Sequence, residues 1–373
     1  MLANLLTGYA INMNISELYT SQLVDKQLFL SDLLAPFYTN EIRTFESPPK
    51  HFRMRAEFRI WHDGDDTFHI MFNQDTKEQY RVDSLPAASV SINLAMQLMT
   101  QALQGNQILR HKLFQIDYLS TTTDEVLISM IYHRQLDDQW IAEVTKLRKM
   151  FSTFSKIDFV GRAKKQKIMV DSDFVNERLL IAGRHYTFKQ IENSFTQPNA
   201  LVNVKMIEWA MSKSEDAEGD LLELYCGAGN FSIPLACKFD KVMATEISKT
   251  SVNAAQINIQ QNAIENLSIV RLSSEEFVQA MRKERVFNRL AGIDIDSFDF
   301  QTVLVDPPRS GLDDETIKLI SMFKNIIYIS CNPNTLKQNL LSLITTHTLV
   351  DAVLFDQFPF TPHIETGVFL QRR

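Results

Sequence analysis

A regular alternation of short apolar runs and amphipathic segments begins near residue 220 and limits the folds available to this part of the chain. Such spacing is typical of parallel strands joined by helices, because parallel neighbours need a long crossover and are buried on both faces. We therefore predict an α/β unit with a mainly parallel, doubly wound sheet. The last two runs leave no room for a helix between them, which predicts a closing antiparallel hairpin. The runs are LLELYC, KVMATEI, LSIVRL, QTVLVDPP, NIIYISC, LVDAVLFDQF and ETGVFLQ.

The first half of the chain has a different pattern. Between about residues 53 and 186, short alternating runs separated by turn-like segments predict antiparallel strands, and helices are expected over 87–104 and 139–154. The pattern changes near Gln197, where a helical stretch leads into the alternating unit. We therefore predict an α+β domain over residues 1–190 and an α/β domain over residues 191–373.

Composition excludes several classes of protein. The three cysteines, Cys226, Cys237 and Cys331, show no CxxC spacing, which argues against a disulfide framework, a zinc site or an iron–sulfur cluster. No apolar run reaches the about eighteen residues that a membrane helix needs, and no secretory leader is recognisable, so we expect a cytoplasmic protein. The net charge of −7 disfavours a nucleic-acid partner only weakly, because the field that a phosphate meets is local.

The segment LLELYCGAGNFS predicts a buried strand, a glycine turn and a helix start, the arrangement at which ligands bind in such sheets. A nicotinamide-dependent oxidoreductase would need a glycine at position 232, where Ser232 stands. Glu246 ends the next strand, where a carboxylate can accept both ribose hydroxyls of a nucleoside cofactor; the alternative is a charge for the helix starting near Ser248. Asp306 ends the fourth strand before two prolines, and we expect it to face the ligand rather than cap a turn.

Cys331 follows an apolar strand and precedes a probable helix start at Asn332. A helix N-terminus lowers a thiol's pKa, which makes Cys331 a candidate nucleophile, whereas Cys226 and Cys237 are better explained as small buried hydrophobes. Glu365, shortly before the last apolar run, is a candidate base. Its alternative is a cross-strand ion pair or a solvated carboxylate.

Taken together, these motifs resemble the uracil-5 RNA methyltransferase family, most closely its tRNA-modifying members. The resemblance covers the whole C-terminal half, and its ordered motifs are far more specific than one glycine turn. They are SFTQPN (194–199), LLELYCGAGNFS (221–232), ATEI (244–247), DPPRSGLD (306–313), YISCNPNTL (328–336) and FDQFPFTPHIETG (355–367).

The resemblance implies a Rossmann-like domain that uses S-adenosylmethionine, without a metal or iron–sulfur cluster, to methylate carbon 5 of uridine 54 in the T loop of tRNA. It implies that Cys331 is the nucleophile and Glu365 the base that releases the product. It further implies a set of cofactor contacts, of which the first two have no support besides the resemblance. These are Gln197, Tyr225, Asn230, Glu246 and Asp306.

The first domain would then bind RNA. Its two basic clusters supply Arg53, Arg55 and Arg59, which alternate along one strand, and Lys164, Lys165 and Lys167. For any single basic residue, a solvated surface charge is an equally good explanation. The expected partner is the T arm of tRNA and, by resemblance, the similar part of transfer-messenger RNA, with no obligatory protein partner evident. Two alternatives stay open: a ribosomal-RNA uracil-5 methyltransferase without a cluster, and a tRNA-folding chaperone.

Overall fold

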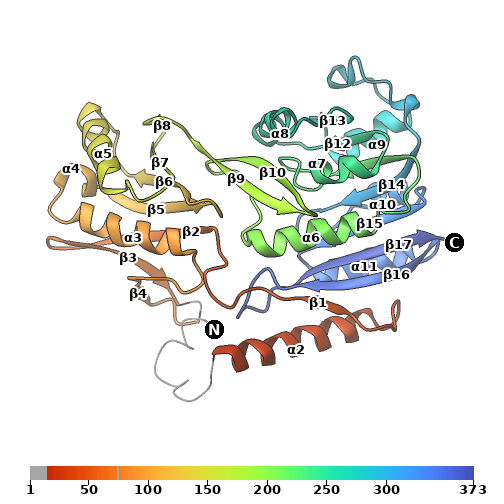
Figure 1. The fold of residues 1–373 in the computed structure, drawn as a ribbon, viewed down its shortest axis with the longest axis horizontal. Helices are drawn as coiled ribbons and strands as arrows, with labels where there is room; N and C mark the ends of the chain where they lie inside the picture. Colours follow the sequence, from red (N-terminus) through yellow and green to blue (C-terminus); the bar gives the residue numbers. More distant parts are fainter. Residues whose placement is uncertain (1–14, 74) are drawn as a thin grey trace.

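The computed structural model describes residues 15–73 and 75–373, which form two sheets and their covering helices (Figure 1). The C-terminal sheet has eight strands in the order β1-β16-β17-β15-β14-β11-β12-β13. Strands β11 to β15 run parallel, and β17 is antiparallel to both β15 and β16, so the predicted doubly wound sheet with a closing hairpin is confirmed. The strands are β1 (Arg43–Phe45), β11 (Asp220–Leu224), β12 (Val242–Thr245), β13 (Leu267–Val270), β14 (Phe300–Val305), β15 (Asn325–Ser330), β16 (His347–Phe355) and β17 (Glu365–Arg372).

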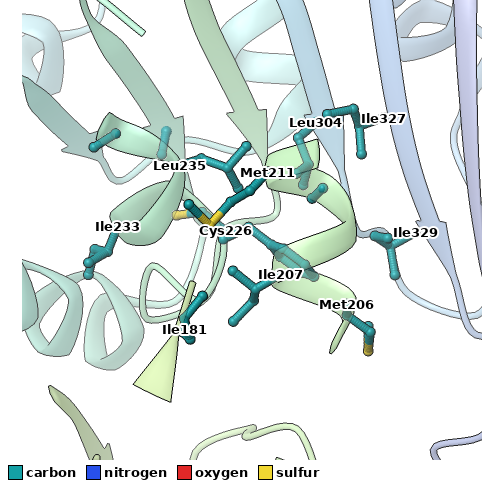
Figure 2. Packing of buried hydrophobic residues seen from close by; sticks show 14 of the residues in the cluster. Ile181, Met206, Ile207, Met211, Cys226, Ile233, Leu235, Leu304, Ile327 and Ile329 are labelled. Carbon is teal, nitrogen blue, oxygen red and sulfur yellow. The ribbon is translucent and has the colours of Figure 1, made fainter. Parts of the chain in front are cut away.

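Helices cover both faces of this sheet, as the continuous apolar runs require. Along β11, Leu221 joins the core on one face, and Leu222 and Leu224 join the core on the other. Figure 2 shows the first core, in which Cys226 packs among aliphatic side chains as a small hydrophobe. The first face is covered by α6 (Ala200–Ser212), α7 (Ser232–Leu235) and α8 (Lys249–Gln261); the second by α2 (Ile15–Leu34), α9 (Ser274–Met281), α10 (Asp314–Ile320) and α11 (Pro333–Leu343).

The second sheet has seven strands in the order β4-β3-β2-β5-β6-β7-β8, mostly antiparallel, with β6 and β7 parallel. Helices α3 (Val90–Leu103), α4 (Gln107–Arg110) and α5 (Asp138–Met150) contribute to its core. The strand β7 was not expected, because the charged sequence GRAKKQK at its end has no alternating pattern. The strands are β2 (Arg55–Asp63), β3 (Asp66–Phe72), β4 (Gln79–Arg81), β5 (Leu113–Ser120), β6 (Glu125–Tyr132), β7 (Lys156–Ala163) and β8 (Gln166–Met169).

Two segments of the first half pack with the C-terminal sheet. Strand β1 pairs parallel to β16, and Leu30 and Leu34 of α2 lie in the second core of that sheet. The hairpin of β9 (Phe174–Ile181) and β10 (Arg184–Ile191) contributes to the first core. The boundary near residue 190 therefore remains a proposal, to which the structure adds that the chain crosses between the halves more than once.

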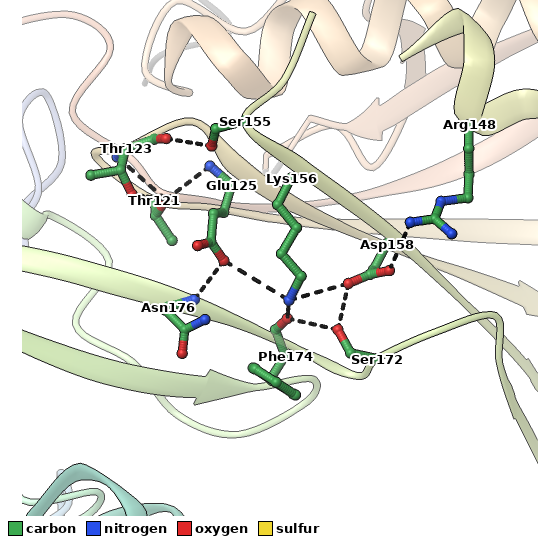
Figure 3. Close-up of polar contacts among 10 residues, drawn as sticks. All are labelled: Thr121, Thr123, Glu125, Arg148, Ser155, Lys156, Asp158, Ser172, Phe174 and Asn176. Carbon is green, nitrogen blue, oxygen red and sulfur yellow. Dashed lines mark hydrogen bonds and ion pairs between the residues drawn. The ribbon is translucent and has the colours of Figure 1, made fainter. Parts of the chain in front are cut away.

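Polar contacts tie this hairpin to the seven-stranded sheet (Figure 3). Lys156 of β7 donates to the carbonyl oxygen of Phe174 at 2.9 Å, and its ammonium group lies 3.2 Å from Asp158. Glu125 of β6 accepts from the backbone N–H of Asn176 at 2.8 Å. The β9–β10 hairpin therefore contacts both the seven-stranded sheet and the first core of the C-terminal sheet, and so links the two halves of the chain.

Gly367 of β17 lies where a helix packs closely on the sheet. A Cβ atom there would stand 2.8 Å from the ring of Trp209 and 2.9 Å from that of Phe355. Gly367→Ala is expected to lower the free energy of unfolding by about 1–3 kcal/mol, because the buried rings must move. Denaturant unfolding measures this cost. It should shrink in a Trp209→Leu background, and an equal cost in both backgrounds would contradict the steric explanation.

Candidate active site at the carboxyl edge of the sheet

Three functional candidates meet where neighbouring strands β14, β15 and β17 end or begin. In the antiparallel register of β15 and β17, Ser330 pairs with Thr366, so the next position brings Cys331 opposite Glu365. Asp306 follows Val305 at the end of β14, the parallel neighbour of β15. Glu365 is buried, while Cys331 and Asp306 are partly buried. The structure therefore brings a thiol and two carboxyl groups to one place.

The expected lowering of the Cys331 pKa is wrong. The helix start is confirmed, since Asn332 caps α11. However, burial, and then the negative charges of Glu365 and Asp306, raise the pKa of the Cys331 thiol to about 11. Arg309 opposes this rise but does not cancel it. Desolvation and nearby carboxylates outweigh the helix terminus, because both disfavour the thiolate directly.

Burial also raises the pKa of the two carboxyl groups. Burial raises the pKa of Asp306 to about 7. Burial, and then the charge of Asp306, raises the pKa of Glu365 well above its usual range. A carboxylate with a raised pKa is a stronger base once it has lost its proton, which suits a group that must accept one during a reaction.

Gln197 lies beside this cluster. Its amide nitrogen is 3.5 Å from an oxygen of Asp306, and its amide oxygen accepts from Gln357 at 3.3 Å. Gln357 also contacts the sulfur of Met206 at 2.9 Å. The sequence analysis did not identify Gln357, although it lies in the motif FDQFPFTPHIETG. Its signal was a polar residue two positions after the apolar end of β16.

The glycine turn after β11 has the backbone that its sequence predicts. Gly227 and Gly229 have φ angles of 56° and 85°. Glu246 joins this turn to the next helix: one carboxylate oxygen accepts from the N–H of Gly227 at 3.0 Å and the other from Ser248 at 2.7 Å. Its contact with the helix start is therefore present, and its role as a ribose ligand remains a prediction.

A cavity of about 420 Å³ opens beside this turn, between the ends of β11, β12 and β13 and the loop after Asp306. Tyr225 and Glu246 both line it, and the Tyr225 hydroxyl lies 2.7 Å from that of Ser274. Asn230 does not line it and instead forms a reciprocal amide pair with Asn203, at 2.8 and 2.9 Å. The cavity therefore brings together two of the five expected cofactor residues.

Glu223 is a second residue that the sequence analysis missed, because one acid in an apolar strand resembles a core position. It lies in β11 and is 1% exposed. Burial raises its pKa to about 8, with further contributions from the charges of Asp306 and Glu246. Ser232 lies near enough to oppose this rise, although within the described ranges neither carboxyl oxygen of Glu223 has a partner at full hydrogen-bonding geometry. Such a group favours a nearby positive charge.

The three arginines expected to bind RNA have different surroundings. Arg53 precedes β2 and donates to the carbonyl oxygen of Arg55 at 2.7 Å, and burial lowers its pKa. Arg55 donates to the carbonyl oxygen of Ser194 at 2.9 Å. Arg59 is exposed, and its guanidinium lies 5.3 Å from the centre of the Phe114 ring. Arg59 is therefore the most accessible of the three.

The three lysines also differ. Lys164 and Lys165 form the exposed two-residue turn between β7 and β8. Lys167 forms ion pairs with Asp173 at 2.7 Å and with Glu192 at 3.3 Å. The turn is therefore the freer part of this cluster.

Among the residues that the structure describes, no three His, Cys, Asp or Glu side chains gather as they would around a metal ion. No helix within those ranges is long and apolar enough to cross a membrane.

The electrostatics of the cluster predict how Cys331 reacts with iodoacetamide. At pH 9 Asp306 is ionised and disfavours the neighbouring thiolate, so Asp306→Asn should increase the alkylation rate up to about tenfold, the effect of lowering the thiol pKa by one. At pH 6 Asp306 is largely protonated, and the two rates should converge. Site-resolved mass spectrometry measures this, with Cys237 as an internal control, since that residue is exposed and not buried as the sequence predicted. A variant that reacts more slowly than the parent at pH 9 would contradict the assignment.

Comparison with sequences of known function gives matches along almost the whole chain. The family model described as tRNA (Uracil-5-)-methyltransferase matches residues 18–373. A tRNA/tmRNA (uracil-C(5))-methyltransferase of Pseudoalteromonas atlantica is 56% identical over 355 residues, covering 95% of this chain and 97% of that protein. The protein of the same name from Pasteurella multocida is 52% identical over 358 residues, covering 96% and 98%.

A solved structure supports the fold independently. It is that of Pyrococcus abyssi tRNA (uracil-54, C5)-methyltransferase in complex with S-adenosyl-L-homocysteine. It matches with a TM-score of 0.71 at 22% identity, covering 94% of this chain and 83% of that one. That likeness concerns the fold, whereas the family model and the relatives show the family: this chain belongs to the tRNA (uracil-5-)-methyltransferase family.

Proposed function

We propose that this protein transfers a methyl group from S-adenosylmethionine to carbon 5 of uridine 54 in the T loop of tRNA, forming 5-methyluridine. Family membership supports the methyltransferase activity, and the names of the relatives support tRNA and transfer-messenger RNA as substrates. The observation that carries the mechanism is the register that brings Cys331 opposite Glu365. The predicted cytoplasmic location is part of the same proposal.

The pair supplies the two groups that the reaction needs. Carbon 5 of uracil is too poor in electrons to attack a methyl group directly. Addition of the Cys331 thiolate to carbon 6 would create an enolate whose carbon 5 can attack the methyl group of S-adenosylmethionine. The bond between that methyl group and the positively charged sulfur would break, and the sulfur would leave as a neutral thioether. Glu365 then removes the proton left on carbon 5, the double bond to carbon 6 re-forms, and the thiolate leaves.

The raised pKa values fit this sequence of events. Burial favours the protonated forms of the Cys331 thiol and the Glu365 carboxyl group. A positive charge placed beside them favours both the thiolate and the carboxylates. The nucleophile would thus become reactive mainly when the cofactor site is filled.

The cavity beside the glycine turn fits the adenosine part of this cofactor. Gly227 has open space where a side chain would stand, so a ligand can approach its backbone. Glu246 would accept from the ribose hydroxyls, and Tyr225 would pack beside the nucleoside. Asn230, Gln197 and Asp306 would contact the rest of the cofactor, with Asp306 and Gln197 nearest the reacting atoms.

RNA would lie over the first half of the chain. Phe114 stacks on His133 with ring centres 3.8 Å apart, and Arg59 covers Phe114. This aromatic and cationic stack can receive an exposed base, while Lys164 and Lys165 can meet phosphates. Arg53 and Arg55 would support RNA binding indirectly, because their hydrogen bonds to backbone carbonyls hold Arg55 and the segment before Gln197. Lys167 would contribute while it remains paired with Asp173 and Glu192. Such contacts would offset the few kcal/mol needed to take uridine out of its stack.

Glu365→Gln should trap the reaction after methyl transfer. The variant keeps the nucleophile but cannot accept the carbon 5 proton, so turnover should fall about 100-fold or more and a covalent protein–RNA complex should accumulate. A denaturing gel with radiolabelled tRNA measures the complex. Normal turnover in this variant would place the base elsewhere.

The target base is tested with tRNA that contains 5-fluorouridine, whose fluorine cannot be removed as a proton is. With S-adenosylmethionine, the wild-type protein should form a stable adduct, and Cys331→Ala should form none. Cytidine at position 54 should abolish the adduct. If the adduct forms regardless of the base at position 54, the covalent mechanism would stand, but the target uridine would lie elsewhere or in another RNA, such as ribosomal RNA. RNA refolding without any adduct would favour a chaperone.

The lysine turn is tested by salt dependence. Replacing Lys164 and Lys165 together by alanine should weaken tRNA binding and reduce the slope of log affinity against log salt by about 1–2, as expected for the loss of one or two phosphate contacts. Filter binding at several salt concentrations measures the slope. Lys283→Ala with Lys318→Ala, which removes the same charge from the other half, is the matched control. An unchanged slope in the first variant would exclude the turn from the RNA interface.

A further inference from the structure

A buried ion pair connects α2, the first helix of the described residues, to the segment that leads into Glu365. The ammonium group of Lys26 in α2 lies 2.7 Å from a carboxylate oxygen of Asp356, which directly follows β16. The exposed fractions of the two side chains are 4% and 0%. Removing two charges from water costs free energy that the attraction between them often only offsets. The pair is therefore weakly explained by stability alone.

Lys26 also reaches the turn beyond Asp356. It donates to the carbonyl oxygen of Phe358 at 3.0 Å, and the same oxygen accepts from the hydroxyl of Thr361 at 2.8 Å. One ammonium group thus holds the end of β16 and the turn that follows it. That turn leads directly to Glu365, the first residue of β17.

Two further contacts from α2 reach the same turn. The side-chain oxygen of Gln22 accepts from the backbone N–H of Phe360 at 2.5 Å, and the ring of Tyr19 packs edge-on against that of Phe360 at 5.8 Å. Phe360 has a φ angle of 59°, which side chains other than glycine rarely adopt. The helix therefore supports a turn that carries local backbone strain.

The same helix is linked to the segment that carries Gln197. The hydroxyl oxygen of Tyr19 accepts from the backbone N–H of Ser47 at 2.8 Å, and the hydroxyl of Ser47 accepts from Asn199 at 2.7 Å. Asn199 caps α6 and stands two residues after Gln197. Both segments that flank the cluster of Cys331, Asp306 and Glu365 thus depend on α2.

We propose that Lys26 and Asp356 are positioning residues, which hold the 356–364 turn so that the Glu365 carboxylate reaches the proton on carbon 5. The inference rests on the function proposed above and assigns a role in one step of it. Methyl transfer depends on Cys331 and the cofactor site, whereas release depends on Glu365. Loosening the turn should therefore slow release more than methyl transfer.

The experiment separates these two steps in a single turnover. tRNA carrying tritium on carbon 5 of uridine 54 reports proton removal, and S-adenosylmethionine with a carbon-14 methyl group reports methyl transfer. In Lys26→Met, tritium release should lag behind methyl transfer by about 10- to 100-fold, the cost of a small misplacement of a catalytic group. A protein–RNA adduct should appear on a denaturing gel. Gln22→Ala should show the same lag to a smaller degree, and Lys26→Arg should restore part of the release rate.

Lys213→Met is the matched control. Lys213 pairs at 2.6 Å with Asp351, on the same strand β16 but four residues before its end. It also joins a helix to that strand, so its loss should leave the ratio of the two rates unchanged. A double variant, Lys26→Met with Asp356→Leu, removes both charges and avoids a stranded buried carboxylate. It should fold and still show the lag.

Three outcomes would overturn the proposal while leaving the proposed function intact: equal slowing of both steps in Lys26→Met, no change in either step, or the same lag in Lys213→Met. Failure of the wild-type protein to release tritium or transfer methyl would instead contradict the proposed function. Calorimetric titration of S-adenosylmethionine shows whether each variant keeps its cofactor site. If Lys26→Met does not fold, Gln22→Ala and the double variant provide the test. Equal slowing of both steps in these variants would overturn the proposal.

Discussion

The pairing of β15 with β17 is the interaction on which the rest of the site depends. A parallel sheet by itself brings only strand ends together, so Cys331 and Asp306 would meet without a partner from the last strand. The antiparallel return of β17 places the start of that strand, Glu365, at the same edge. Opposing positions in an antiparallel pair are fixed by backbone hydrogen bonds, and a slip of one residue would turn the carboxylate away.

Burial of this strand edge also raises the pKa of the side chains that meet there. Cys331, Asp306 and Glu365 share a poorly solvated space. The charges of both carboxylates disfavour the Cys331 thiolate, and the charge of Asp306 disfavours the ionised form of Glu365. This environment therefore favours the protonated forms of Cys331 and Glu365. Burial likewise raises the pKa of Glu223 in β11, the strand that leads into the glycine turn. A site of this kind favours a positively charged ligand and limits unwanted reactions of the thiol when none is bound.

Contacts between segments that are far apart in sequence also support the carboxyl edge of the C-terminal sheet. Helix α2 lies against the C-terminal half although it begins the described chain (Figure 1). Its contacts with the 356–364 turn and, through Ser47, with Asn199 join three segments that are far apart in sequence. The β9–β10 hairpin similarly joins the two sheets through Lys156 and Glu125. The organisation of the site is therefore a property of the whole chain.

The sequence alone predicts the doubly wound sheet, the glycine turn, the helix start at Asn332 and the family, because periodicity, turn residues and ordered motifs are local signals. It could not determine the pKa of Cys331, since a helix terminus is visible in sequence whereas burial and the facing carboxylates are not. Nor could it show that Arg53 and Arg55 bind backbone carbonyls, or that Lys26 pairs with a residue 330 positions away. Those facts depend on which segments pack together, and only the tertiary structure decides that.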